Sequence, residues 1–459
     1  MKIIKKGGEL SVFLRRRSPA EILVFGFAAV IVIGALILNL PISSANGQSP
    51  GLLNCLFTAT SCVCVTGLIV VDTGTYWSIF GQVVMIILIQ IGGLGFMSLM
   101  TIIFVLAGKR ITIKNRLLLQ SSVNADRLQG VVKFTKYIVF SAMAIEAVGA
   151  LLLMIVFIPE YGVGKGIYFG IWHSISSFCN GGFDLMGNYS SFTKYVNNGL
   201  LSFTVCALIA IGGLGFAVTS DIWNYRRTRR LSTHTKVVLT ATAFLIVGGA
   251  VLFYIFEHNN PNTMGELPWY GKIIASIYQS VTPRTAGSNT ISQTGMTTPS
   301  KLLTMLLMFV GGSPGSTAGG VKTTAIFLLF LVLYSVLTAK KDVTCFKRRM
   351  PLNLIRQTIG LVMIAVSIIV VSIMLLLVIE PGVDPVHIAF EVFSAYGTVG
   401  LSCDLTPHLH AARKVILILN MFVGRVGPLT IAYVITRKER RELENKGQYR
   451  LPEGNILIG

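Results

Sequence analysis

Four short segments of this sequence each contain a glycine in the same setting. Each glycine follows a short semi-polar segment that lies between two long apolar ones. The glycines are Gly67, Gly182, Gly287 and Gly400, which are 115, 105 and 113 residues apart. Recurrence at near-regular spacing indicates an internal structural repeat. Four such loops predict a pseudo-fourfold ring of backbone carbonyls, which is how a cation filter is built.

The apolar segments between these loops determine the fold class. The chain is 53% hydrophobic and only 13% charged, and its mean hydropathy is +0.71. A soluble protein of 459 residues needs far more polar surface. Several apolar runs exceed the roughly 20 residues that a helix needs to cross a bilayer. The sequence therefore predicts an all-α polytopic membrane protein. Ile22–Leu40 is long for a signal peptide and lacks a convincing cleavage site, so we interpret it as a retained first helix.

Positive charge is concentrated between the apolar segments. The net charge is +20, and 30 of the 39 Lys and Arg residues lie in five clusters. The clusters are at residues 1–17, 109–136, 226–236, 340–356 and 437–450. Such clusters mark the cytoplasmic side of a membrane protein, so both termini are expected in the cytoplasm. None of the clusters is interleaved with stacking aromatic residues, which argues against a nucleic-acid partner.

The basic clusters divide the chain into four units with the same order of elements. Each unit has a membrane helix, a half-helix of about a dozen residues, a glycine loop and a second membrane helix. A half-helix is too short to span but suits a re-entrant pore helix buried among protein neighbours. The prediction is thus eight transmembrane helices and four pore helices in a pseudo-fourfold arrangement. The expected boundaries are a cytoplasmic N-terminus at 1–18, pore repeats at 19–108, 109–225, 226–338 and 339–437, and a cytoplasmic tail at 438–459; the second repeat opens with a cytoplasmic loop at 109–134.

The second helices are expected at residues 76–106, 198–224, 300–337 and 412–436, and they contain a repeat of their own. The segment Ile91-Gly92-Gly93-Leu94-Gly95-Phe96 recurs at 211–216, with relatives at 310–315 and 423–428. Small residues let membrane helices approach closely. Close helix packing explains most of this pattern in units one and two.

The glycine loops have the chemistry that a dehydrated cation requires. Carbonyl oxygens can replace its water shell without placing full negative charge in the pore, and glycine tolerates the dihedral angles needed to aim them inward. The C-terminal end of each half-helix adds partial negative charge. The predicted filter residues are Val65, Thr66, Gly67, Asn180, Gly181, Gly182, Thr285, Ala286, Gly287, Thr398, Val399 and Gly400.

Acidic residues lie just beyond three of the loops. Asp72, Asp184 and Asp404 follow the loop glycines by five, two and four residues. A ring of carboxylates at the outer mouth would concentrate cations there. The alternative is that each is a solvated loop acid.

One second helix is interrupted by a stretch that cannot be a lipid-facing helix. It consists of Gly311, Gly312, Ser313, Pro314, Gly315, Ser316, Thr317, Ala318, Gly319 and Gly320. Non-helical backbone at this depth survives only beside protein or a water-filled cavity. A flexible gate below the filter fits this stretch, and a simple hinge is the alternative. Residues 315–323 miss the nucleotide-binding pattern GxxxxGK[ST] by one position, and no strand precedes them, so we reject that interpretation.

Arg425 lies inside an otherwise apolar helix. An intramembrane charge usually has a partner and a purpose. Facing the pore, it would oppose a cation and form part of the gate. Its candidate partners are the 311–320 loop and Glu146, and the alternative is a structural Arg–Glu pair away from the pore. Lys322 is expected to snorkel to the cytoplasmic interface.

These motifs together resemble the Trk/Ktr/HKT superfamily of potassium transporters. The resemblance is carried by Ser280-Val281-Thr282-Pro283-Arg284-Thr285-Ala286-Gly287, the two GGLGF segments, the residues 315–320 and Gly424-Arg425-Val426-Gly427. It covers nearly the whole chain and is strongest to the KtrB-type membrane subunits. It implies a bacterial plasma-membrane protein whose filter glycines, binding K⁺, are Gly67, Gly182, Gly287 and Gly400, with 311–320 as the gating loop.

The same resemblance implies the ions and partners. K⁺ would be the substrate and Na⁺ the activating ion, with no covalently bound cofactor. The chain would form a homodimer with one pore per subunit, regulated by a cytoplasmic KtrA-type RCK ring that itself binds ATP or ADP. The basic segments 109–136 and 226–236 and the C-terminal tail are the expected contacts with this ring. The sequence departs from the family pattern at Ser288, where an aromatic residue such as Phe183 is expected.

Other function classes fit the sequence less well. No loop contains the full TVGYG of tetrameric potassium channels, so selectivity for K⁺ over Na⁺ depends on the resemblance. A secondary transporter or a channel for another monovalent cation such as Na⁺ remains the alternative, although carriers usually show two inverted halves. The six histidines show no HExxH spacing, and no serine or cysteine has an evident catalytic partner, so an enzyme is not expected.

Overall fold

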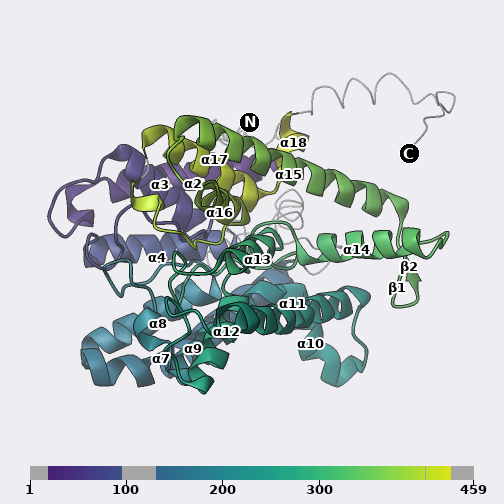
Figure 1. Cartoon of the computed structure of the whole chain (residues 1–459), viewed down its shortest axis with the longest axis horizontal. Helices are drawn as coiled ribbons and strands as arrows, with labels where there is room; N and C mark the ends of the chain where they lie inside the picture. The colour runs from purple at the N-terminus through teal and green to yellow at the C-terminus, as the bar shows by residue number, and fades with distance from the viewer. Residues whose placement is uncertain (1–18, 96–130, 409, 436–459) are drawn as a thin grey trace, which may run out of the picture.

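The computed structural model describes residues 19–95, 131–408 and 410–435. The expected N-terminal segment 1–18, the tail at 438–459 and most of the loop at 109–134 lie outside these residues. The described part is built almost entirely of helices (Figure 1). It also contains one antiparallel hairpin, in which β1 (Thr344–Cys345) pairs with β2 (Arg348–Arg349). The fold is therefore that of an all-α polytopic membrane protein.

The helices follow the order predicted for the four units. Unit one contains α2 (Pro19–Leu38), α3 (Leu52–Val63) and α4 (Ile79–Leu94). Unit two contains α7 (Val131–Tyr161), α8 (Val163–Phe178), α9 (Gly199–Leu214) and α10 (Phe216–Thr228). Unit three contains α11 (Thr233–Glu257), α12 (Trp269–Val281), α13 (Thr298–Phe309) and α14 (Thr323–Leu337). Unit four contains α15 (Leu352–Ile379), α16 (Pro385–Gly397), α17 (Ala411–Val426) and α18 (Pro428–Ile435). Short 3₁₀ turns lie at Pro41–Ser43, Thr193–Tyr195 and Thr406–His408.

The first helix of every unit is long and apolar enough to cross a membrane. These helices are α2, α7, α11 and α15. The bent pairs α9–α10 and α17–α18 also qualify if each pair is counted as one span. The apolar helices α4 and α14 are shorter. The count of eight spanning helices therefore stays a prediction for units one and three.

The second helices of units two and four are not continuous, which corrects the expectation for residues 198–224 and 412–436. The chain bends by 96° between α9 and α10 and by 94° between α17 and α18. The breaks lie at Gly215 and Gly427, which both have φ of +91°. Positive φ cannot continue a right-handed helix, and glycine adopts it without steric cost. In unit one, α4 ends at the equivalent Gly95, where φ is +79°.

The four units close into a ring. The second helix of each unit packs against the pore helix of the next, giving the pairs α4–α8, α9–α12, α13–α16 and α17–α3. The last pair joins unit four back to unit one. Each pore helix is thereby held between its own unit and the preceding one, as a pseudo-fourfold pore requires.

The glycines of the second repeat let the second helices of units one, two and four also pack closely against the pore helix of their own unit. A Cβ atom on Gly92, Gly212 or Gly424 would lie closer than 3.0 Å to a carbonyl at the end of the pore helix in the same unit. The prediction of close packing in units one and two is therefore confirmed. In unit three, Gly311 instead faces the carbonyl of Gly319, because the interrupted segment folds back on itself.

The segments that follow the helix breaks lie toward one side of the molecule. In Figure 1, α10, α14 and the β1–β2 hairpin all lie on the right, away from the pore helices α3 and α8 on the left. The basic residues of the segments 226–236 and 340–356 belong to this side. This arrangement agrees with one cytoplasmic end for these segments.

Candidate functional site

The four loop glycines meet in a closed ring. A Cβ atom on Gly67 would lie 2.8 Å from the Cα of Gly182, and one on Gly182 would lie 3.1 Å from the Cα of Gly287. One on Gly287 would lie 3.2 Å from the Cα of Gly400, and one on Gly400 would lie 2.9 Å from the Cα of Gly67. The backbones approach so closely that a side chain has no room at any of the four positions. Tertiary structure thus brings together four residues that are more than 100 positions apart in sequence.

The backbone conformation of the loops repeats as well. Gly67, Gly182, Gly287 and Gly400 all have positive φ, between +73° and +97°. The residue two positions earlier is also left-handed in every loop; these residues are Val65, Asn180, Thr285 and Thr398, with φ between +52° and +75°. Three of the four are β-branched, for which this conformation costs about 1–3 kcal/mol each. Strain of this kind, repeated four times around one axis, indicates a functional backbone.

The middle residue of each loop does not have positive φ. Alternation between left- and right-handed conformations turns successive peptide groups toward the same side of the chain. Carbonyls of consecutive residues can then face one axis. All twelve predicted filter residues lie in these four segments, so the arrangement suits the cation filter that the sequence predicts.

A serine that the sequence analysis missed secures three of the loops. Ser61, Ser176 and Ser394 each lie six residues before the loop glycine. Their carbonyls accept hydrogen bonds from the N–H groups of Thr66, Gly181 and Val399, at 2.8, 2.6 and 2.8 Å. The signal was present in the sequence as a threefold Ser-x5-Gly repeat.

The hydroxyls of the same serines hold the loops a second time. The N–H of Gly67 donates to Ser61 Oγ at 3.0 Å, and the N–H of Gly400 donates to Ser394 Oγ at 3.1 Å. Ser176 instead donates to the carbonyl of Phe183. Unit three differs by one residue in register, because Thr282, five residues before Gly287, takes this place and donates to the carbonyl of Ser288.

The outer face of the ring opens into a cavity of about 240 Å³. All four loop glycines line it, together with the predicted outer-mouth acids Asp184 and Asp404. The third predicted acid, Asp72, is not among the residues that line this cavity. Its carboxylate accepts hydrogen bonds from the N–H groups of Thr75 and Tyr189, both at 2.9 Å. Asp72 thus ties the first outer loop to the second.

The interrupted segment 311–320 packs directly beneath the second pore helix. The N–H groups of Ser313 and Thr317 donate to the carbonyls of Gly213 and Gly212, at 3.0 and 3.2 Å. The Thr317 hydroxyl donates to the carbonyl of Phe178, the last residue of α8, at 3.1 Å. The glycine-rich end of α9 therefore holds the loop through its carbonyls.

The far end of the same segment lies against the fourth filter loop. A Cβ atom on Gly319 would collide with the Thr398 side chain, and one on Gly320 would lie 3.2 Å from the carbonyl of Gly397. The loop is closed at its base by a parallel bridge between Val310 and Val321. The loop thus lies just below the glycine ring, at the position where the sequence predicts a gate.

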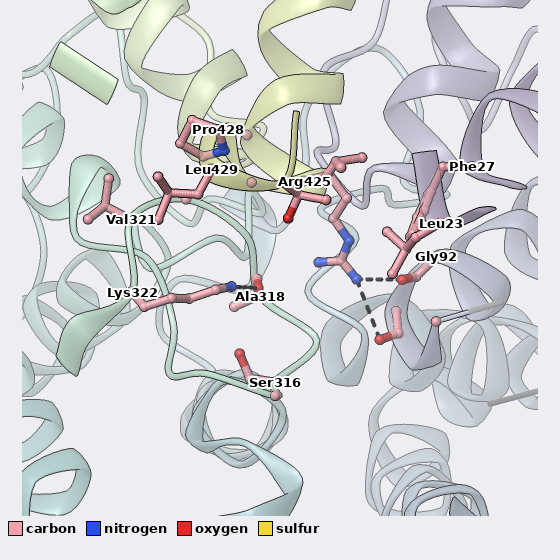
Figure 2. Close-up of a pocket in the computed structure, with 18 of the residues that line it drawn as sticks. Leu23, Phe27, Gly92, Ser316, Ala318, Val321, Lys322, Arg425, Pro428 and Leu429 are labelled. Atoms are coloured by element: carbon pink, nitrogen blue, oxygen red, sulfur yellow. Dashed lines mark hydrogen bonds between the residues drawn. The ribbon is translucent and has the colours of Figure 1, made fainter. Parts of the chain in front are cut away.

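Arg425 joins the loop to unit one. Its guanidinium donates to the carbonyls of Thr317 and Gly92, and to that of Gly93 at 3.4 Å. Figure 2 shows the guanidinium reaching the end of α4. The loop is therefore a partner of Arg425, as predicted.

Glu146 is not a partner of Arg425, which corrects the alternative. Its carboxylate accepts two hydrogen bonds from Gln90 Nε2, at 3.0 and 3.1 Å. Cys179 also faces it. The predicted Arg–Glu pair is therefore absent from the described residues.

A cavity of about 300 Å³ lies beneath the loop, lined by the break between α17 and α18 and by the end of α4. Arg425 and Lys322 are the charged side chains among its described lining residues. Lys322 does not extend away to the interface as expected. Its Nζ turns back to donate to the carbonyl of Ala318 at 2.9 Å (Figure 2). Two basic side chains therefore line the cavity beneath the loop.

Comparison with known proteins agrees with this geometry. Residues 8–442 match the TrkH family, which is described as cation transport proteins. The chain belongs to the TrkH family. The superfamily resemblance is thus confirmed, and the family consists of ion transporters rather than enzymes.

Several relatives match the TrkH-family chain over nearly its full length. The potassium/sodium uptake protein NtpJ of Enterococcus hirae is 40% identical, covering 97% of this chain and 98% of that protein. The Ktr system potassium uptake protein B of Bacillus subtilis is 38% identical, with 97% of both chains covered. That of Vibrio alginolyticus is 36% identical, with 96% and 94% covered. The crystal structure of the potassium transporter TrkH from Vibrio parahaemolyticus shares the fold, with a TM-score of 0.74 at 17% identity over 95% of this chain and 87% of that one.

The outer cavity of this TrkH-family chain should respond to external pH through Asp184. Burial, with a smaller contribution from the Asp72 carboxylate, raises the pKa of Asp184 to about 6. As pH falls through 6, the carboxyl takes up a proton and the mouth loses a negative charge. We expect the KM for cation uptake to rise between pH 7.5 and pH 5, measured as initial uptake rates. Asp184→Asn should remove this change.

Asp404→Asn is the matched control for this pH dependence. It removes a carboxylate from the same cavity but keeps Asp184. The rise in KM at low pH should therefore persist in this variant. A pH dependence that survives Asp184→Asn would show that another group is responsible.

Proposed function

We propose that this chain is the ion-conducting membrane subunit of a potassium uptake system. The observation that carries the proposal is the closed ring of four glycines with its fourfold repeated backbone conformation. A ring of backbone carbonyls coordinates a dehydrated monovalent cation without the charge that would hold it too tightly. The names of the relatives, which are potassium or potassium/sodium uptake proteins, support K⁺ as the substrate.

In this proposal K⁺ binds among the carbonyls of the segments 65–67, 180–182, 285–287 and 398–400. Na⁺ acts as the activating ion. The name of NtpJ includes both ions, so transport of Na⁺ in place of K⁺ is the alternative function. The two differ in which ion saturates uptake.

The segment 311–320 and Arg425 form the gate of the proposed pathway. The segment lies against Thr398 on its filter side and against Gly212 and Gly213 on its other side. Arg425 pins it to unit one through the carbonyl of Thr317. A cation leaving the filter would meet this loop and then the basic side chains Arg425 and Lys322 of the inner cavity, so the loop must move for conduction.

Control of the gate is assigned to a cytoplasmic partner. The words "Ktr system" in the names of the relatives imply further components. We propose a homodimer of this chain with a KtrA-type RCK ring, which carries the ATP or ADP. Both termini lie in the cytoplasm, and the chain resides in the plasma membrane with the repeat boundaries given above. Of the expected ring contacts, the 226–236 segment and residues 131–136 fall within the described residues.

Complementation tests this function. The chain is expressed in a bacterium that lacks its own potassium uptake systems, and growth is measured at low external K⁺ beside an empty-vector control. We expect restored growth and saturable K⁺ uptake that is faster with Na⁺ present. Failure to restore growth, with the protein verified in the membrane, would contradict the proposal. Saturable Na⁺ uptake that K⁺ does not inhibit would instead establish the alternative.

A further inference from the structure

One position of the pore helices has a structural role that neither the filter nor the gate explains. It lies nine residues before the loop glycine in every unit. The residues at this position are Thr58 on α3, His173 on α8, Tyr278 on α12 and Glu391 on α16. All four side chains are buried, with at most 2% of their surface exposed. Four chemically different residues therefore occupy one equivalent place around the glycine ring.

Glu391 holds the segment that follows the fourth filter loop. Its carboxylate accepts hydrogen bonds from the hydroxyls of Ser402 and Thr406, the second at 2.8 Å. The N–H groups of Cys403 and Leu405 also face it. The Glu391 carboxyl group therefore meets two hydroxyls and two backbone N–H groups, all of which can donate to it. All four donors come after Gly400, on the outer side of the filter.

Tyr278 makes the equivalent contact in unit three. Its hydroxyl hydrogen-bonds Ser288 Oγ at 2.6 Å, and Ser288 directly follows Gly287. This contact explains the serine found where the family pattern favours an aromatic residue. In this unit the large side chain, Tyr278, belongs to the pore helix, and the small hydroxyl, that of Ser288, belongs to the loop.

His173 makes the contact in unit two. Its Nε2 accepts a hydrogen bond from the N–H of Leu185 at 3.0 Å, three residues beyond Gly182. The opposite ring nitrogen, Nδ1, lies 2.7 Å from the carbonyl of Phe169. A ring that accepts at Nε2 and donates at Nδ1 is neutral. Aromatic rings enclose it with centroids 5.2–5.7 Å away; they belong to Phe157, Phe169, Trp172 and Phe192.

Unit one lacks such a contact. Thr58 is too short to reach the outer segment, and its buried hydroxyl has no hydrogen-bond partner among the described residues. The first filter loop is held from below by Ser61 but not by the residue at this position. The four loops therefore differ in how firmly their outer ends are fixed.

We propose that His173, Tyr278 and Glu391 are positioning residues that fix the outer ends of three filter loops and thereby set ion selectivity. This inference rests on the proposed function of the glycine ring as a filter. Selectivity depends on the number and placement of carbonyls around the ion. A pore-helix side chain bonded just beyond the glycine limits how far those carbonyls can move. Unit one has no such contact from its pore helix among the described residues, and its outer segment is held by Asp72 instead.

Tyr278→Phe is the sharpest test because it removes one hydroxyl and leaves the ring in place. The measurement is the ratio of K⁺ to Na⁺ uptake rates, together with the KM for K⁺ and the amount of protein in the membrane. We expect the ratio to fall about threefold or more. A threefold change corresponds to the lower end of the interaction energies measured between contacting residues. Ser288→Ala should have a similar effect and add little to Tyr278→Phe, because both remove the same hydrogen bond.

Glu391→Gln and His173→Phe extend the test to the other two units, and both should lower the same ratio. Thr58→Val is the matched control, since it removes an unpaired hydroxyl at the equivalent position without changing shape. It should leave the ratio unchanged. It should also not reduce the amount of protein in the membrane, because removing a buried hydroxyl that has no hydrogen-bond partner does not destabilise the fold.

The outcomes separate this inference from the function on which it rests. If the wild-type chain shows no selective K⁺ uptake, the assignment of the glycine ring as a filter is wrong. Wild-type selectivity that is retained in Tyr278→Phe, at normal membrane levels, would overturn the positioning role alone. So would an equal loss in Thr58→Val. If Glu391→Gln or His173→Phe fails to reach the membrane, Tyr278→Phe with Ser288→Ala decides the question.

Discussion

Gly287→Ala and Gly400→Ala should each weaken the affinity and the selectivity of K⁺ uptake strongly, while Gly360→Ala leaves both unchanged. A Cβ atom on Gly287 would collide with the carbonyl of Val399, and one on Gly400 with the carbonyl of Thr66. Both glycines also have positive φ, which strains any side chain. Neither backbone carbonyl can give way without moving a neighbouring filter segment. Gly360 on α15 has open space where its Cβ would be.

The size of this effect follows from the strain. A left-handed non-glycine residue costs about 1–3 kcal/mol, and the collision adds to it, so the KM for K⁺ should rise about tenfold or more. The same substitution at Gly67 or Gly182 should cost less, because the added Cβ lies farther from its nearest neighbour. Initial rates of K⁺ and Na⁺ uptake at several concentrations measure both affinity and selectivity. Wild-type kinetics in Gly287→Ala and Gly400→Ala would remove the filter assignment.

Deleting residues 314–317 from the gate loop should raise cation flux even without regulatory subunits. The base of the loop tolerates the deletion, because Val310 pairs with Val321 and Gly312 lies against Ala318. The deletion removes the Thr317 contacts with Gly212 and with Arg425. Flux measured in vesicles containing the chain alone should increase about tenfold, as expected for loss of an interaction near 1.4 kcal/mol. Unchanged flux at normal protein levels would reject the gate.

Arg425→Ala should act in the same direction, for two reasons. It releases the loop from unit one, and it removes a positive charge that lies in the inner cavity. Arg425→Lys is the informative companion because it keeps the charge but cannot reach two carbonyls at once. A larger rise in Arg425→Ala than in Arg425→Lys would assign part of the barrier to the charge. Equal rises would assign the barrier to the loop.

Parts of the site were readable from the sequence because they repeat. The loop glycines, the glycine pairs of the second helices and the Ser-x5-Gly spacing all recur in several units, although the last was overlooked. The positioning residues could not be found in this way, since His173, Tyr278 and Glu391 have no chemistry in common. The break at Gly215 was also missed. Its sequence is that of a helix-packing motif. Whether such a glycine allows close packing or ends the helix depends on the segment that lies against it.

The sequence alone determined that this chain is a membrane protein, and it predicted four similar units with a loop glycine in each. The physical reason is local: a bilayer accepts only backbone that satisfies its own hydrogen bonds, so apolar length and charge position define the elements. Only the tertiary structure decided that the glycine ring closes, that Arg425 holds the gate loop and not Glu146, and that Lys322 turns back toward Ala318. These contacts depend on the packing of particular units, and the longest, between Gly92 and Arg425, joins residues 333 positions apart. No sequence period specifies which distant carbonyl a buried cation will meet.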